Sequence, residues 1–321
     1  MYRAPSVIGF SVKVSPSAEE ILGWRPADLV GRALTEILQN CRTLAFRGQT
    51  LWWGNYAQLV VVVAATGLGK VNAAITTASL LEWLTVSQVW HLGCTGAYSG
   101  GPLEIGDVQI TDRILCGDEG VLTRDGLMAV SRIGIPILVH RGEKFFDRVP
   151  LCWNEAMRKL IETTPPGCYR QRRGSLPSPA CPCAPDGLER SEGAAGRRTA
   201  AVPAQASFPR SSVVPENDEG FRLHYGPSLT VGMTSGDPEV AAERFRRYGA
   251  YAENMEGSAV AQTCCRFTIP MIECRGVSNF AGTRAKEAWE LETSIAHCHG
   301  IIMTWLKAAD AMQRPSRGYK A

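Results

Sequence analysis

Short apolar runs alternate with amphipathic stretches along most of the chain, which is typical of a protein with layered strands and helices. The clearest run, residues 59–65 (LVVVVAA), has the composition of a strand that is buried on both faces of a sheet. A glycine-containing turn follows it, and apolar positions then recur at helical spacing. The strands predicted in this way span residues 7–14, 59–65, 86–92, 108–112, 228–233 and 270–277. The predicted helices begin at Ser17 or span residues 27–38, 71–84, 125–132, 238–248, 256–267 and 291–312.

The succession of strand, glycine loop and helix predicts the α/β class, with a twisted mixed central sheet between two layers of helices. We expect a single three-layer α/β/α domain over residues 1–321. Residues 1–55 fit this pattern poorly and form an atypical N-terminal segment. Residues 165–215 hold nine prolines and seven arginines but only six Val, Ile, Leu or Phe residues. Such a stretch buries too little apolar surface to order itself, so we expect a disordered insertion within the domain.

Charge and cysteine spacing argue against several functions. The net charge is +3, from 34 basic and 31 acidic residues, which creates no general field for binding nucleic acid or an anionic membrane. The eleven cysteines form no CxxC pair, so we expect neither a metal site nor an organic cofactor. No apolar run approaches the roughly 20 residues that span a bilayer, and residues 1–11 lack the apolar block of a signal peptide. These features indicate a soluble, cytoplasmic protein with reduced thiols.

Four segments rich in glycine or polar residues lie at predicted strand ends or helix starts, where open α/β sheets usually bind ligands. They are Thr66–Ala74 (TGLGKVNAA), Gly93–Tyr98 (GCTGAY), Glu253–Ala259 (ENMEGSA) and Arg275–Asn279 (RGVSN). A glycine loop at a helix N-terminus presents backbone N–H groups to an anion, or simply packs the helix on the sheet. Glu256 either caps its helix or holds a ligand. The small residues Cys94, Thr95 and Gly96 leave room for a ligand beside their strand.

Together these segments resemble the nucleoside phosphorylase/hydrolase superfamily, over residues 57–150 and 220–310. The resemblance implies a homo-oligomeric enzyme that cleaves the bond between a purine base and ribose. It implies that the Glu256 carboxylate accepts hydrogen bonds from two vicinal ribose hydroxyls and stabilises the positive charge that develops on the sugar. Met255 is then expected against the face of the sugar.

Asn279 bears on the identity of the base. In the related methylthioadenosine/S-adenosylhomocysteine nucleosidases, an aspartate at this strand end protonates adenine. An amide cannot supply a proton, but it can donate a hydrogen bond to N7 or O6 of a 6-oxopurine. Asn279 therefore favours hypoxanthine or guanine over adenine.

Two further segments, 117–123 (GDEGVLT) and 279–289 (NFAGTRAKEAW), resemble the futalosine hydrolases. This resemblance implies that Arg284 and Trp289 hold the base or the aromatic carboxylate of futalosine; otherwise they are a surface arginine and a packing tryptophan. The reaction implied is hydrolysis of futalosine to hypoxanthine and dehypoxanthine futalosine, a step of menaquinone biosynthesis.

A hydrolase needs a carboxylate that activates water, and the superfamily carries it just after the first strand, where Glu19 and Glu20 are the candidates. No arginine lies beside either glycine loop, as a phosphate site would require. The alternatives are another purine nucleosidase or phosphorylase, acting on methylthioadenosine or inosine, and a nucleoside-binding protein without turnover. A dinucleotide-binding oxidoreductase is disfavoured because Asn72 stands where GxGxxG has its third glycine.

Overall fold

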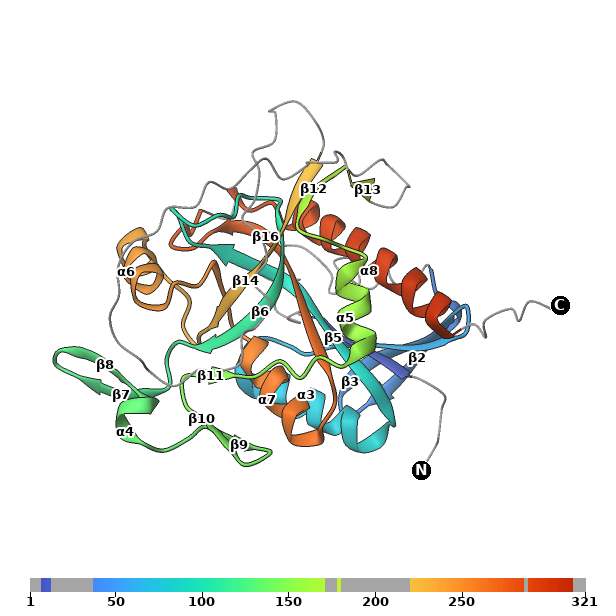
Figure 1. Ribbon diagram of the computed structural model, residues 1–321, viewed down its shortest axis with the longest axis horizontal. Coiled ribbons are helices and arrows are strands. Elements are labelled where there is room, and N and C mark those ends of the chain that lie inside the picture. The colour runs from blue at the N-terminus through green and yellow to red at the C-terminus, as the bar shows by residue number, and fades with distance from the viewer. Residues whose placement is uncertain (1–6, 13–36, 171–177, 180–219, 286–287, 314–321) are drawn as a thin grey trace, which may run out of the picture.

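A computed structural model describes residues 7–12, 37–170, 178–179, 220–285 and 288–313 of the chain. One twisted sheet runs through the molecule, with helices on both of its faces (Figure 1). Its main strand order is β13-β12-β14-β6-β16-β5-β1-β4-β3-β2, and its pairs are partly parallel and partly antiparallel. This mixed sheet between helical layers agrees with the architecture predicted from the sequence.

The strands of the main sheet are β1 (Val7–Val12), β2 (Gln39–Phe46), β3 (Gln49–Tyr56), β4 (Leu59–Ala65), β5 (Val86–Ala97), β6 (Val108–Cys116), β11 (Arg148–Val149), β12 (Gly167–Arg170), β13 (Ser178–Pro179), β14 (Gly220–Thr230), β15 (Ala252–Asn254) and β16 (Met271–Phe280). Two hairpins stand apart from it: β7 (Gly120–Thr123) with β8 (Gly126–Ala129), and β9 (Leu138–His140) with β10 (Glu143–Phe145). The helices are α3 (Gly69–Trp83), α4 (Val130–Ile133), α5 (Glu155–Glu162), α6 (Pro238–Tyr248), α7 (Gly257–Phe267) and α8 (Leu291–Gln313).

The alternation of side chains along β4 explains the two helical layers. Successive side chains of a strand point to opposite faces of its sheet. Val61 and Val63 pack in one apolar cluster with residues of α5 and α8, whereas Val62 packs in a second cluster with residues of α3 and α7. The continuous apolar run at residues 59–65 therefore reflects burial on both faces.

The atypical N-terminal segment contributes to the middle of the sheet. Its first strand, β1, pairs in parallel with both β4 and β5. Farther along, β2 and β3 form an antiparallel hairpin that extends the sheet beyond β4, which the sequence pattern did not reveal. The helix expected from Ser17 and residues 27–36 of the helix expected over 27–38 lie outside the described residues, and residues 37 and 38 are not helical.

Several predicted elements need correction. Residues 93–97 were expected to form a turn but continue β5, because β16 and the short strand β15 both pair with them. The helix predicted at 125–132 is instead β8 followed by the single turn α4. Its first part turns back on β7 because the Thr123 hydroxyl donates to the Gly126 carbonyl and Gly126 has φ +106°, a conformation that favours glycine. The strand predicted at 228–233 is the end of β14, which stops at Thr230.

The predicted insertion at 165–215 begins too early. Residues 167–170 form β12, which pairs antiparallel with β14, and Tyr169 stacks on Phe221 with 5.6 Å between ring centroids. This tertiary pairing orders residues whose local composition alone does not. Of the remainder, only residues 178–179 (β13) are described, and 171–177 and 180–215 lie outside the described residues.

Helix α6 has the boundaries predicted from the sequence, residues 238–248. The Asp237 side chain accepts hydrogen bonds from the backbone N–H groups of Glu239 and Val240, Pro238 occupies the first turn, and Gly249 ends the helix in the left-handed conformation. Helix α8 is the longest of the described helices. None of the helices in the described residues combines the length and the apolar character that crossing a bilayer would take.

Candidate active site

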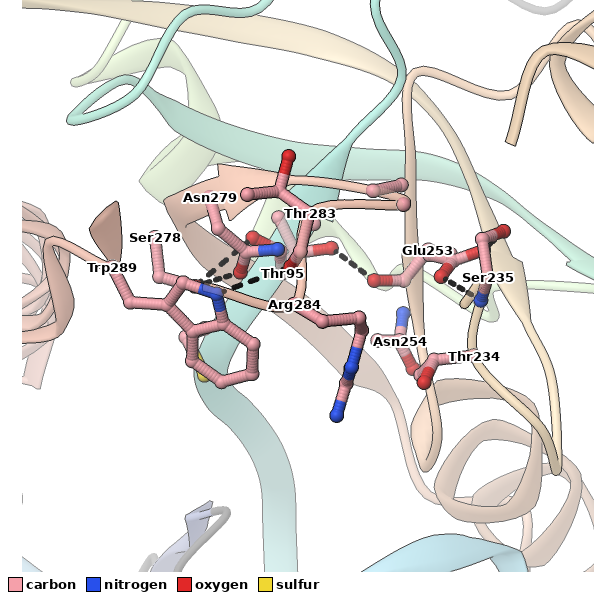
Figure 2. A pocket seen from close by; sticks show the side chains of 14 residues that line it. Thr95, Thr234, Ser235, Glu253, Asn254, Ser278, Asn279, Thr283, Arg284 and Trp289 are labelled. Carbon is pink, nitrogen blue, oxygen red and sulfur yellow. Dashed lines mark hydrogen bonds between the residues drawn. The ribbon is translucent and has the colours of Figure 1, made fainter. Parts of the chain in front are cut away.

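A pocket lies at the carboxyl ends of β5 and β16, beside β15 (Figure 2). The residues predicted to leave room for a ligand, Cys94, Thr95 and Gly96, line one wall. The loop after β14 contributes Thr234 and Ser235 to the opposite side. This is the edge at which an α/β sheet is expected to bind ligands.

Of the eight sequence-predicted site residues that the structure describes, six are brought together here and two are not. The pocket is lined by Cys94, Thr95, Gly96, Asn279, Arg284 and Trp289. Met255 and Glu256 follow the lining residue Asn254 along the chain but do not line the pocket themselves. Glu19 and Glu20, the predicted activators of water, lie outside the described residues.

Asn279 has a fixed orientation near the end of β16. Its amide oxygen accepts a hydrogen bond of 2.8 Å from the Ser278 hydroxyl, and its Nδ2 donates to the Phe280 carbonyl at 2.9 Å. An amide nitrogen carries two hydrogens, so one donor remains after these contacts. Gly96 lies beside it, since a Cβ there would be in ordinary van der Waals contact with the Asn279 amide nitrogen, at 3.4 Å.

Arg284 and Trp289 form one unit on the loop between β16 and α8. The guanidinium of Arg284 lies 5.5 Å from the centroid of the Trp289 ring, within cation–π distance. The indole N–H of Trp289 donates to the Thr283 carbonyl at 3.2 Å, which orients the ring. Figure 2 shows the Arg284 side chain extending between Trp289 and Asn254. Among the described residues that line the pocket, Arg284 is the one cationic side chain.

Sequence reasoning missed Glu253, a buried carboxylate in the pocket wall. It accepts hydrogen bonds from Tyr98 Oη at 2.9 Å, Ser235 N at 2.6 Å and Ser235 Oγ at 2.7 Å. Arg244 of α6 adds an ion pair at 3.1 Å. These donors come from three separate segments, 9 to 155 residues from Glu253, and no periodic pattern links them. The satisfied carboxylate anchors the loop after β14 over the pocket.

The structure separates the two expected roles of Glu256. The Asn254 side chain, not Glu256, caps α7: its Oδ1 accepts from the backbone N–H groups of Glu256 at 3.1 Å and Gly257 at 2.8 Å. Glu256 makes no side-chain capping bond although it occupies the N-cap position. Capping therefore does not explain this carboxylate.

The Glu256 carboxylate instead turns to the glycine loop. Its Oε1 accepts a hydrogen bond of 3.0 Å from the backbone N–H of Gly69, the first residue of α3. The N-terminus of a helix carries a partial positive charge and unpaired N–H groups. The glycine loop was predicted either to bind an anion or to pack the helix; the anion at Gly69 is the protein's own carboxylate.

Arg275 connects Glu256 to a second buried carboxylate. Its Nη1 lies 3.9 Å from Glu256 Oε2, and its Nη2 donates to Glu273 Oε1 at 2.8 Å. His91 Nδ1 lies 3.1 Å from the same oxygen, and Thr111 donates to Glu273 Oε2 at 2.8 Å. The sheet dictates this chain, because Glu273 and Arg275 are two residues apart on β16 and share a face, and Glu273 pairs in register with His91.

The protonation states within this chain follow from burial and charge. Burial raises the pKa of Glu273, but the Arg275 charge and the hydrogen bond with His91 outweigh it and lower the pKa to about 2. Burial lowers the pKa of Arg275, but the charges of Glu273 and Glu256 raise it above its usual value. Burial and the charge of Arg275 lower the pKa of His91, which keeps the ring neutral at pH 7.

The Asp118–Glu119 segment fastens the glycine loop from outside the pocket. Lys70, next to Gly69, forms ion pairs with Asp118 at 2.5 Å and Glu119 at 2.6 Å. Asp118 also accepts from the backbone N–H of Gly232, just after β14. Burial lowers the pKa of Lys70, but its hydrogen bonds to the two carboxylates raise it above its usual value, so the lysine stays charged.

Comparison with known proteins identifies the family of the chain. The Phosphorylase superfamily matches residues 29–303. The futalosine hydrolase of Thermus thermophilus is 25% identical over 83% of this chain and 89% of its own. The 5'-methylthioadenosine/S-adenosylhomocysteine nucleosidase of Mycobacterium tuberculosis is 28% identical over 69% of this chain and 70% of its own.

Solved structures show the same fold. A nucleosidase of the same name from Colwellia psychrerythraea, in complex with adenine, matches with a TM-score of 0.63 and 17% identity over 96% of this chain and 97% of that one. Futalosine hydrolase of Helicobacter pylori matches with a TM-score of 0.61 and 15% identity over 94% of this chain and 97% of that one.

The chain belongs to the Phosphorylase superfamily. The three-layer α/β/α fold and the resemblance to this superfamily are confirmed. The expectation of an enzyme that hydrolyses N-glycosidic bonds is also confirmed, since these relatives are nucleosidases and hydrolases of that kind.

The buried ion pairs of Arg275 with Glu273 and Glu256 predict a stability that depends on acid. The pKa of Glu273 is about 2 in the folded protein against a usual 4.5. As the pH falls, Glu273 therefore takes up its proton at a higher pH in the unfolded state than in the folded state. The stabilisation by its charge is complete above pH 4.5 and is lost as the pH falls from about 4.5 to about 2. The loss is roughly 3 kcal/mol. We expect urea unfolding to show this fall, and Glu273→Gln to be less stable at pH 7 and less dependent on acid.

The exposed Glu155, paired with Lys159 on α5, provides the control. Glu155→Gln should match the wild type at every pH because exposed ion pairs contribute little. An unchanged acid dependence in Glu273→Gln would show that other carboxylates govern it.

Proposed function

We propose that this enzyme hydrolyses the N-glycosidic bond of futalosine, releasing hypoxanthine and dehypoxanthine futalosine. The observation that carries the proposal is the amide of Asn279, held at the pocket by Ser278 and Phe280 with one N–H uncommitted. The similarity to the futalosine hydrolase of Thermus thermophilus, over 83% of this chain, supports the same substrate. By that likeness the reaction belongs to menaquinone biosynthesis.

The orientation of Asn279 favours a 6-oxopurine. The Ser278 hydroxyl donates to the amide oxygen and the amide nitrogen donates to the Phe280 carbonyl, which fixes the amide and leaves one N–H to donate to a base. Departing hypoxanthine gathers negative charge on O6 and N7, and a donor there stabilises the transition state without proton transfer. Adenine leaves most readily when N7 is protonated, which an amide cannot do.

The Arg284–Trp289 unit suits the remainder of futalosine, which carries an aromatic carboxylate. A guanidinium pairs well with a carboxylate, and its stacking on an indole restricts its motion. The cation–π contact at 5.5 Å places both groups on one side of the pocket. We assign this unit to the carboxylate of the substrate.

Glu256 is assigned to the ribose. A carboxylate can accept several hydrogen bonds, so the bond from Gly69 does not prevent Glu256 from also accepting one from a sugar hydroxyl. The carboxylate is fully buried, so ribose can reach it only when the glycine loop moves aside. Its negative charge would then stabilise the cationic sugar of the transition state. Met255, next to it and half-buried, is assigned to the sugar face.

Activation of water is assigned to Glu19 or Glu20, which follow the first strand in the sequence. The enzyme is expected to act as a homo-oligomer, by analogy with its superfamily. The second candidate function is hydrolysis of methylthioadenosine or S-adenosylhomocysteine, which the similarity to the mycobacterial nucleosidase and to the Colwellia structure favours.

The first test is base release by the purified full chain from futalosine, methylthioadenosine, S-adenosylhomocysteine and inosine, each with and without phosphate. We expect rapid hypoxanthine release from futalosine that is independent of phosphate. Faster adenine release from either adenine nucleoside would support the second candidate instead. A requirement for phosphate would identify a phosphorylase, and tight binding without release would identify a binding protein.

Glu256→Gln should lower kcat with futalosine by about a hundredfold or more, since a neutral amide cannot stabilise the cationic sugar. Circular dichroism and a thermal melt would verify that the variant is folded. Glu82→Gln, on the exposed surface of α3, is the matched control and should retain full activity. Near-normal turnover in folded Glu256→Gln would remove this residue from the mechanism.

Asn279→Asp should lower kcat/KM for futalosine about tenfold or more, because a carboxylate repels the negative charge on hypoxanthine. The same change should raise adenine release from methylthioadenosine, since a protonated aspartate can supply the N7 proton. Asn55→Asp, on the distant strand β3, controls for the added charge. If the ratio of the two activities stays constant, Asn279 does not select the base.

A further inference from the structure

Two pairs of thiols lie in contact at the same separation but in different surroundings. Cys152 Sγ lies 3.7 Å from Cys265 Sγ, and Cys274 Sγ lies 3.7 Å from Cys298 Sγ. None of the four residues lines the pocket. Any chemistry of these thiols is therefore independent of the proposed function.

Cys152 has the features of a reactive thiol. It follows β11, is only half-buried, and its sulfur lies 3.7 Å from Nε2 of His140 on β9. A hydrogen bond from Cys265 and, despite partial burial, the charges of His140 and Arg141 lower the pKa of Cys152 to about 6. The reactive form of cysteine is the thiolate, and these contacts favour that form at Cys152.

Cys265 is suited to the second half of a two-thiol reaction. It is buried in the last turn of α7, and its single S–H lies within reach of two acceptors, the Cys152 sulfur at 3.7 Å and the Pro150 carbonyl at 3.2 Å. The hydrogen bond with Cys152 and burial raise its pKa well above the usual value. Cys265 thus remains a protonated thiol beside the Cys152 thiolate, hidden from large oxidants.

The second pair lacks both access and a favourable charge balance. Cys274 and Cys298 are buried in the apolar cluster between β16 and α8. Burial, followed by the hydrogen bond with Cys298, raises the pKa of Cys274 well above its usual value. Proximity of two sulfurs is therefore common to both pairs, and only Cys152 combines it with access and a nearby imidazole.

We propose that Cys152 and Cys265 form a peroxide-reactive dithiol site, in which Cys152 is the attacking thiol and Cys265 the resolving thiol. The Cys152 thiolate attacks one oxygen of a hydroperoxide, the O–O bond breaks, and the departing oxygen takes a proton as water or an alcohol. Cys265 then attacks the sulfur of the Cys152 sulfenic acid, forming the disulfide and releasing water. The two thiols lose two electrons, and the peroxide gains them.

The geometry allows the second step with small movements. A disulfide bond measures about 2.05 Å, so the sulfurs at 3.7 Å must approach by about 1.7 Å. The product would link the segment after β11 to the last turn of α7. This helix has Glu256 at its N-terminus and Cys265 in its last turn.

The test treats the full chain with hydrogen peroxide, blocks remaining thiols with iodoacetamide, and maps tryptic peptides without reduction. We expect a linked peptide joining residues 149–158 to residues 248–266. Cys264 lies on the second peptide, so Cys264→Ser identifies the partner: the link should survive it and disappear in Cys265→Ser. In Cys265→Ser, a dimedone probe should label Cys152 as a sulfenic acid, and Cys152→Ser should abolish both products.

Cys298→Ser is the matched control from the buried pair and should leave the link unchanged. In a brief reaction with iodoacetamide at pH 7, Cys152 should be alkylated at least about tenfold faster than Cys274. Equal oxidation of the two pairs, a sulfenic acid that persists in the wild type without the link, or a link that survives Cys265→Ser would overturn the proposal. Circular dichroism of each variant separates a lost reaction from a lost fold.

Discussion

The buried guanidinium of Arg275 is the constraint on which the arrangement of the site depends. A charge that is removed from water is stable only when opposite charges and hydrogen bonds surround it. Glu273 on the same strand and Glu256 at the start of α7 supply the charges, and His91 and Thr111 complete the contacts. Loss of one partner would leave an uncompensated charge, at a cost of about 3–5 kcal/mol. These buried contacts hold β5, β6, β16 and α7 in one relative position.

The close packing around Glu273 explains why the first residue of α7 is a glycine. A Cβ on Gly257 would stand 2.5 Å from the Glu273 carboxylate, so only glycine lets α7 begin there. Asn254 caps the helix in place of Glu256, and the Glu256 carboxylate accepts a hydrogen bond from Gly69. The carboxylate of Glu256, at the start of α7, thus interacts with both the glycine loop and the buried Arg275. The pocket forms above it, where β5 and β16 end.

Much of the fold could be predicted because strands and helices leave periodic patterns in the sequence. The run at 59–65 became β4, and the helix predicted at 238–248 became α6 with the same bounds. Prediction failed where pairing between distant segments decided the outcome. Residues 93–97 extend β5 because β15 and β16 pair with them, and β12 is ordered by β14 despite a composition typical of disorder.

The sequence by itself determined the motifs, the strand ends that carry them and the superfamily, since residue type and spacing are local properties. It also placed Asn279 and Glu256 as candidates for contact with a ligand. Only the tertiary structure decided which of these side chains meet. It put Glu256 on Gly69, Lys70 on Asp118, and Cys152 beside Cys265, pairs that are 187, 48 and 113 residues apart. Contacts over such separations depend on how the sheet is assembled, and no periodicity along the chain records that order.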